Sequence, residues 1–259
     1  MRRDERAMVA GLSGASLPRS EEALDLALAL GEHADGTVRG AALAALPWRV
    51  DVDAERVGRR LLRGLEDADA GVRNEAAQAL SGDELVGRAD LEPALLRRLW
   101  LEADEITRCS LCEALEWHGG PRAAPALLQA ASRDGWLVRA WAVEAVGWVG
   151  CDEDGRAALR AWARDPDDAR FAKSAAMALV LLGERSFAAR ASEAALRDQD
   201  AAIGLLQSLR ALAWRRPHEA RRLRQGFPGF FRRVGEAFPA LASEATELRD
   251  TLHGGEFVA

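Results

Sequence analysis

The sequence has no tyrosine, a single lysine (Lys173) and only three cysteines. An odd number of cysteines without a signal peptide indicates reduced thiols rather than a disulfide framework. No apolar run approaches the roughly 20 residues of a membrane-spanning helix. The N-terminal residues Met-Arg-Arg-Asp-Glu-Arg have no apolar core of the kind that signal peptides need. We therefore expect a cytoplasmic protein with no membrane span. The shortage of lysine, together with abundant alanine, glycine and arginine, is typical of a GC-rich bacterial genome.

Motifs for metal binding and for common kinds of catalysis are also missing. The four histidines make no pair at metal-ligand spacing. Cys109 and Cys112 form one CxxC pair, but a structural zinc site usually needs four ligands. Because no second pair exists, both are interpreted as buried small residues. There is no glycine-rich phosphate loop, nucleophile elbow or zinc-protease motif. The sequence thus predicts no metal, no cofactor and no enzymatic activity.

The charge balance is negative, with a net charge of −6. Phosphate binding needs a basic footprint, so this balance argues against nucleic acid as a partner. Basic residues concentrate near the C-terminus, where the segment from Trp214 to Phe238 holds seven arginines and two glutamates, a local charge of +5. Phenylalanines and arginines alternate there. The segment is interpreted either as a terminal cap of the fold or as a basic docking surface for a partner or an acidic lipid.

A repeated helical pattern fills most of the chain. Its clearest copy runs from Asp69 to Leu80 and reads Asp-Ala-Gly-Val-Arg-Asn-Glu-Ala-Ala-Gln-Ala-Leu. The aspartate is a typical helix N-cap, and the apolar residues that follow fall on one helical stripe. Successive copies end 30 to 35 residues apart, at Leu46, Leu80, Leu115, Val146, Leu179 and Leu209. A period in this range indicates a solenoid.

An Asp-x-x-Val-Arg-x-x-Ala-Ala-x-Ala-Leu helix that follows a leucine-rich helix resembles the HEAT repeat. The short period is most similar to the HEAT-like repeats of phycobilisome lyases. The resemblance covers about residues 20–214 and implies an all-α, right-handed α–α superhelix (a solenoid) of about six helical hairpins with terminal caps. We expect residues 1–20 to form an N-terminal cap or link, residues 21–214 the repeat array and residues 215–259 a C-terminal helical cap. Columns of Asp (35, 69, 104) and Arg (39, 73, 108, 139) are expected to form an ionic ladder between repeats.

The outward stripe of the second helix in each hairpin carries a pattern of tryptophan and glutamate. By analogy with HEAT arrays, this stripe lines the concave surface of the solenoid. Tryptophan takes its last position in repeats one, three and four, and glutamate takes its middle position in repeats three and four. The candidate partner-binding residues are Trp48, Glu113, Glu116, Trp117, Trp141, Glu144 and Trp148.

Indoles are favoured anchors of binding hot spots, and an indole face beside a carboxylate suits a cation. The stripe therefore predicts a scaffold, adaptor or inhibitor-type module that binds a protein or peptide with exposed Arg or Lys side chains. The alternative interpretation is that each tryptophan fills a gap between neighbouring repeats. Trp100, Trp136 and Trp162 are expected to be packing residues. The sequence does not indicate an oligomeric state.

Two classes of HEAT-like enzyme stay open as alternatives. DNA glycosylases for alkylated bases use a groove with Trp, Asp and Arg, and the segment from Trp136 to Trp141 resembles such a helix. Their groove is basic, however, whereas the stripe of this chain is acidic. Phycobilin lyases share the repeat type, but no residue of this chain identifies bilin chemistry.

Overall fold

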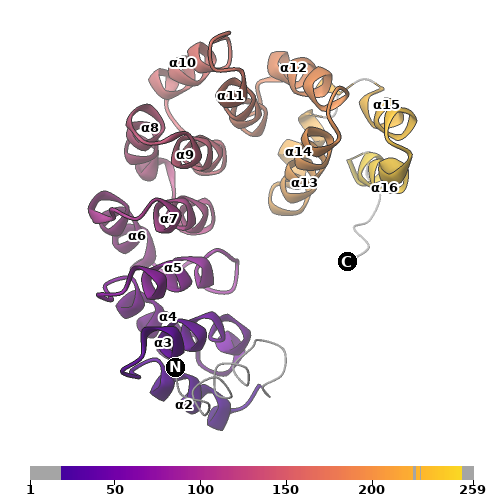
Figure 1. Ribbon diagram of the computed structural model, residues 1–259. Helices are drawn as coiled ribbons and strands as arrows, with labels where there is room; N and C mark the ends of the chain where they lie inside the picture. Colours follow the sequence, from indigo (N-terminus) through magenta and orange to yellow (C-terminus); the bar gives the residue numbers. More distant parts are fainter. Residues whose placement is uncertain (1–18, 224–225, 228, 253–259) are drawn as a thin grey trace. The chain divides into compact units, whose positions relative to one another are not determined.

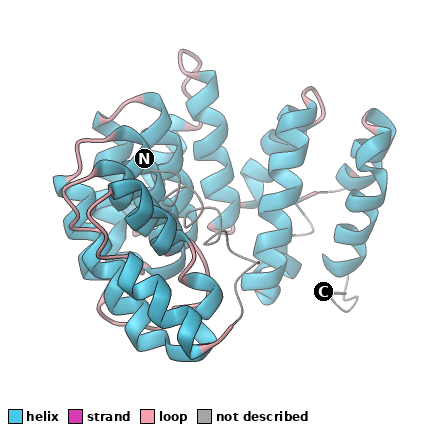
Figure 2. Cartoon of the chain, turned by 60° about the horizontal axis from the view of Figure 1, so that its bottom comes forward, coloured by secondary structure: helices cyan, strands magenta, loops and turns pink. Residues whose placement is uncertain are grey.

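The computed structural model describes residues 19–223, 226, 227 and 229–252. Within these residues all regular structure is helical and no strand occurs (Figures 1 and 2). The chain divides into two compact units, Met1–Val149 and Gly150–Ala259, which we call the N-terminal and C-terminal units. None of the described helices combines the length and the apolar character that crossing a membrane requires.

Four helical hairpins form the described part of the N-terminal unit. In each hairpin a first helix, the A helix, packs against a second, the B helix, and the B helices of successive hairpins contact one another (Figure 1, indigo to magenta). The hairpins are α2 (Glu21–Leu30) with α3 (Gly36–Ala44), α4 (Val50–Gly64) with α5 (Ala70–Ala79), α6 (Leu91–Leu101) with α7 (Glu105–His118), and α8 (Ala124–Arg133) with α9 (Trp136–Val149). Short 3₁₀ turns, Pro47–Arg49 and Pro121–Ala123, precede α4 and α8.

The B helices begin where the repeat pattern predicts. Asp35, Asp69 and Asp104 each accept a hydrogen bond of 2.8 Å from a backbone N–H of the following first turn. These caps satisfy donors that have no partner inside the helix. The predicted packed stripe of α5 is buried throughout and consists of Val72, Ala76, Ala77 and Leu80. The local pattern is therefore confirmed: a capped helix with one small, apolar face turned into the core.

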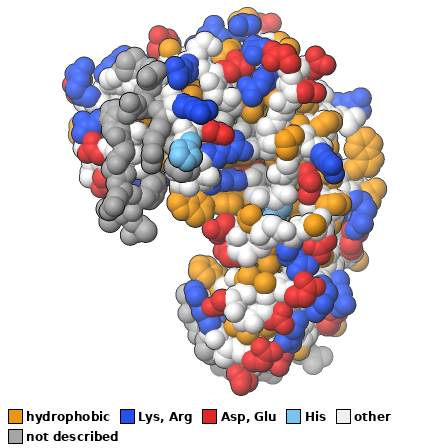
Figure 3. All heavy atoms as spheres, turned by 180° about the vertical axis from the view of Figure 1, so that it is seen from behind, with side chains coloured by type: hydrophobic (Ala, Val, Ile, Leu, Met, Phe, Trp, Pro, Cys, Tyr) orange, Lys and Arg blue, Asp and Glu red, His pale blue; other side chains and the backbone are white. Residues whose placement is uncertain are grey.

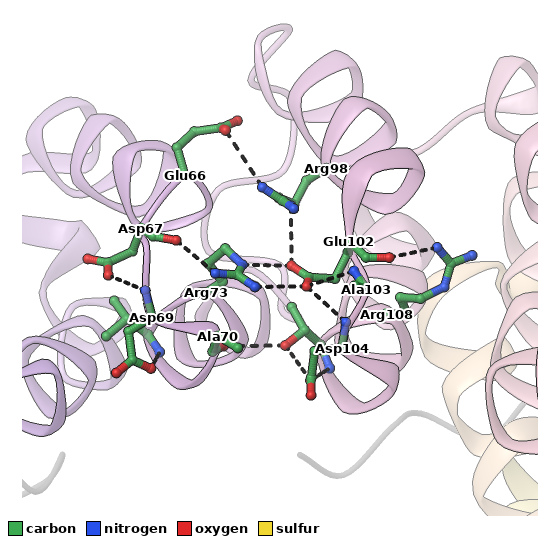
Figure 4. Close-up of polar contacts among 12 residues, drawn as sticks. Glu66, Asp67, Asp69, Ala70, Arg73, Arg98, Glu102, Ala103, Asp104 and Arg108 are labelled. Carbon is green, nitrogen blue, oxygen red and sulfur yellow. Dashed lines mark hydrogen bonds and ion pairs between the residues drawn. The ribbon is translucent and has the colours of Figure 1, made fainter.

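An ionic ladder joins successive hairpins near the start of the B helices (Figure 4). Arg73 of α5 donates two hydrogen bonds, of 2.7 and 2.9 Å, to Glu102 in the turn of the next hairpin. The equivalent pairs join Arg39 to Asp67 and Arg108 to Asp134. The predicted ladder is thus confirmed in this unit, with one correction. Its acids are not the aspartates of the predicted column, because those carboxylates cap their own helices.

Two more hairpins and three further helices form the described part of the C-terminal unit. They are α10 (Glu153–Trp162) with α11 (Ala169–Leu181), α12 (Arg185–Ala195) with α13 (Gln199–Arg215), and then α14 (Pro217–Leu223), α15 (Phe230–Ala237) and α16 (Ala242–Leu252). Helices α14 and α16 pack on α13. Phe227, Phe230 and Phe231 are buried and contact one another, with ring centroids 5.3 to 6.4 Å apart. These three phenylalanines of the arginine-rich segment therefore pack against one another and are not exposed.

The all-α solenoid of six hairpins is confirmed. The two compact units meet between Val149 and Gly150, and the segment boundaries expected at residues 20 and 214 stay a prediction. Nearly all of the expected N-terminal segment, residues 1–20, lies outside the described residues.

Candidate functional site

The B helices α5, α7 and α9 of the N-terminal unit run parallel, in a fixed register. Hydrogen bonds tie α7 to α5 near the start, the middle and the end of the two helices. They join Thr107 Oγ1 to Ala70 O (3.3 Å), Ser110 Oγ to Asn74 Oδ1 (2.8 Å) and His118 Nε2 to Leu80 O (2.7 Å). At the next junction, Gly135 lies against Glu105 at one end and Gly119 lies against Val149 at the other. Residues at equivalent repeat positions are therefore neighbours across these helices.

Glu113 of α7 and Glu144 of α9 occupy equivalent repeat positions on the outward stripes of two neighbouring B helices. Both side chains are half-buried. No described residue makes an ion pair or a hydrogen bond with either carboxylate. Burial raises the pKa of Glu113, and burial together with the nearby Glu113 raises the pKa of Glu144. The structure thus brings these two predicted site residues together, with negative charge that no cation within the described chain offsets.

A third half-buried carboxylate lies on a B helix and was not among the predicted site residues. Glu75 of α5 is half-buried, its side chain lies over Gly40 of α3, and burial raises its pKa. A Cβ at Gly40 would come within 3.2 Å of Glu75 Cγ. The sequence could have identified Glu75 as a candidate site residue, because it lies on the outward stripe of the clearest repeat copy.

Two of the predicted indoles stand beside the acidic pair. Trp141 lies three residues before Glu144, and Trp117 lies four residues after Glu113. Both residues are half-buried. Glu116 is half-buried as well. Helical spacing places Trp141 and Trp117 about one turn to either side of the acidic pair. We call Glu113, Trp117, Trp141 and Glu144 the Trp/Glu face.

Two other predicted anchors differ from this arrangement. Trp148 is only 4% exposed, so the expectation of an outward indole was wrong there. The physical reason is that the last turn of α9, residues 145–149, is buried all round and has no outward stripe. Trp48 is 52% exposed, in the 3₁₀ turn after α3. It lies two hairpins before α7, and no interaction of its ring with the Trp/Glu face is present.

The tryptophans expected to be packing residues behave differently from one another. Trp162 does pack, with its ring 5.4 Å from that of Phe171. Trp100 and Trp136 are 68% and 54% exposed, so that prediction was wrong for both. Exposed apolar side chains therefore occur outside the Trp/Glu face, and on the side seen in Figure 3 they lie among acidic and basic groups alike. Exposure of an indole alone does not identify a site in this protein.

Reactive groups are scarce in the described residues. Burial raises the pKa of the Cys109 thiol to about 11 and raises that of Cys112 as well. Both side chains are buried, as the sequence predicts, and neither is poised as a thiolate. Among the described residues, no group of three His, Cys, Asp or Glu side chains is arranged to hold a metal ion.

The sequence pattern of HEAT repeats matches residues 58–147 and, in an overlapping stretch, residues 92–180. Residues 58–180 therefore belong to the HEAT-repeat family. The array resembles the X-ray structure of the Escherichia coli protein YibA, with 14% identity, 98% of this chain and 93% of that chain covered, and a TM-score of 0.52. It also resembles the crystal structure of an engineered protein, with 18% identity, 82% and 98% coverage and a TM-score of 0.50. At these identities the likeness shows the fold alone. Among curated proteins, none matches the sequence.

Proposed function

We propose that this HEAT-repeat protein is a non-enzymatic interaction module that binds a basic segment of a protein partner on its Trp/Glu face. HEAT repeats generally mediate protein interactions, and solenoid arrays offer extended surfaces for them. The observation that carries the proposal is the pair Glu113 and Glu144. These two half-buried carboxylates lie side by side and have no cationic neighbour among the described residues.

The burial of Glu113 and Glu144 has a cost in free energy when both are charged. A carboxylate withdrawn from water is unfavourable unless a cation or hydrogen-bond donors compensate it. Guanidinium or ammonium groups placed beside Glu113 and Glu144 would supply that compensation. Such cations would also meet the indole of Trp141 or Trp117, and cation–indole contacts contribute about 0.5 to 2 kcal/mol. Charge and aromatic surface thus favour the same chemical class of ligand.

The three acids of the ladder are compensated differently. Asp67, Glu102 and Asp134 each pair with an arginine of the preceding hairpin. The acids that join successive hairpins are therefore held by arginine. The acids of the Trp/Glu face have no such partner, which supports a role in binding and not in packing.

Fluorescence anisotropy with labelled arginine-containing peptides tests the proposal. We expect binding to the wild-type chain that weakens with added salt and is lost in the double variant Glu113→Gln/Glu144→Gln. Trp141→Ala should weaken it as well. Trp100→Ala is the matched control, because it removes an exposed indole from the A helix α6 and leaves the Trp/Glu face intact.

Either of two results would overturn the proposal. One is the absence of measurable binding to every basic peptide. The other is binding that the double glutamine variant retains in full. The variants are informative because the folded state of the chain already disfavours both charges, so their neutral isosteres should not unfold it.

A further inference from the structure

The spacing of the two carboxylates restricts the shape of the partner. Glu113 and Glu144 sit at the same level of two parallel, contacting helices. Packed helices lie about 8 to 10 Å apart. A partner that pairs a separate cation with each acid therefore presents two cationic side chains on one side, separated by about the distance between the helices.

The indoles restrict the thickness of the partner. Trp141 stands three residues before the acidic pair and Trp117 four residues after it. At 1.5 Å per residue, the two indoles are offset by about 10 Å along the helix axes. An α-helix with its side chains is about 10 to 12 Å across. It would take up the whole interval between the two indoles and leave no space for a cationic side chain to stack on either ring. A single extended chain occupies about 5 Å and leaves room for its side chains.

We propose that the partner lies as an extended segment across α7 and α9, with two arginine side chains three residues apart that pair with Glu113 and Glu144. This inference rests on the proposed function and specifies the partner's shape. In a polyproline II conformation, residues three apart project from the same side and are about 9 Å apart, which matches the helix spacing. Arginine suits the site better than lysine, because its planar guanidinium binds a carboxylate in bidentate fashion and stacks on an indole.

A set of proline-rich peptides of equal length and composition tests the spacing. Each peptide carries two arginines, placed one, two, three, five or seven residues apart, and affinity is measured by fluorescence anisotropy. We expect the peptide with separation three to bind the wild-type chain roughly tenfold more tightly than those with separations one and five. Glu113→Gln and Glu144→Gln should each abolish that preference.

Two controls keep the interpretation specific. Glu66→Gln removes a carboxylate that pairs with Arg97 on the exposed surface, so it changes the net charge equally without altering the Trp/Glu face. Trp100→Ala removes an exposed indole elsewhere. Both controls should keep the preference for separation three.

The possible outcomes are distinguishable. Equal affinity at all separations would overturn the extended, two-arginine partner and leave the proposed function standing. A preference for any separation other than three would also overturn the inference. If none of the peptides bound, the proposed function itself would fail.

Discussion

Glu102→Gln should destabilise the N-terminal unit severely. The side chain of Glu102 is fully buried and accepts hydrogen bonds from the Arg73 guanidinium and from the backbone N–H groups of Ala103 and Asp104. Arg98 Nε lies 3.2 Å from its other carboxylate oxygen. The Arg73 guanidinium, the largest cause, lowers the pKa of Glu102 from 4.5 to about 2. A shift of that size corresponds to about 3 kcal/mol of stability at neutral pH.

The pH dependence has a definite sign. The folded-state pKa of Glu102 lies below the unfolded one, so its contribution is present above about pH 4.5 and is lost as pH falls toward about 2. The glutamine variant has no such proton to bind. The free energy of unfolding of the variant should therefore lie far below that of wild type at neutral pH, and the difference should be smaller at about pH 3.

Glu144→Gln is the same substitution with the opposite expectation. Burial and Glu113 raise the pKa of Glu144 in the folded state. The charge of Glu144 therefore opposes folding above its folded-state pKa, and the opposition disappears as pH falls below its unfolded-state pKa. The glutamine variant should be as stable as wild type or more stable at neutral pH.

Urea unfolding followed by tryptophan fluorescence measures both variants. Six of the eight tryptophans belong to the N-terminal unit, so the signal reports mainly on the unit that is altered. Asp51→Asn serves as an exposed control, because the carboxylate of Asp51 pairs with the exposed Arg19, and a change below about 1 kcal/mol is expected. An unchanged midpoint for Glu102→Gln at neutral pH, or a large loss for Glu144→Gln, would refute the reasoning.

Three further changes test the packing. Arg49 is fully buried, and its Nε and Nη2 have no hydrogen-bond partner in the described residues, so Arg49→Met should raise stability to urea by about 1 to 3 kcal/mol. A methyl group on Gly64 would lie 2.9 Å from Ala76 Cβ and 2.5 Å from Leu43 Cδ1, so Gly64→Ala should lower stability in the same assay by about 1 to 3 kcal/mol. In native protein a thiol reagent should modify the half-exposed Cys151 first, and both buried thiols of α7 should react only after denaturation.

The parts of the fold that sequence reasoning predicted are those that depend on neighbours along the chain. A cap such as Asp69 and a stripe such as the one ending at Leu80 are decided within one helix, because the aspartate bonds its own first turn and helical spacing selects the buried face. The same spacing aligned Glu113 with Glu144. The acidic half of the candidate site could therefore be predicted from the order of the residues alone.

The predictions that were wrong concern side chains whose burial depends on residues distant in the sequence. Trp148 and Trp141 share one helical stripe, yet only Trp148 is enclosed, because the whole last turn of α9 is covered. Trp100 was expected to pack against a neighbouring helix. It lies near the end of an A helix, where no described residue covers it, and is exposed. The acids of the ladder were also missed, since Arg73 selects Glu102 through the geometry of the turn and not through repeat position.

The contrast between paired and unpaired acids also distinguishes carboxylates that stabilise the fold from those that we assign to binding. Glu102 and Glu144 are the same residue type in neighbouring hairpins of one unit, and both are withdrawn from water. One is held by two arginines, while the other faces a second carboxylate. Packing alone would favour a neutral side chain at Glu144, because an uncompensated charge lowers stability. A bound cationic ligand reverses that preference, because it supplies the positive charge that no described residue places beside Glu144. Added arginine peptide should therefore stabilise wild type against urea and leave the double variant Glu113→Gln/Glu144→Gln unaffected.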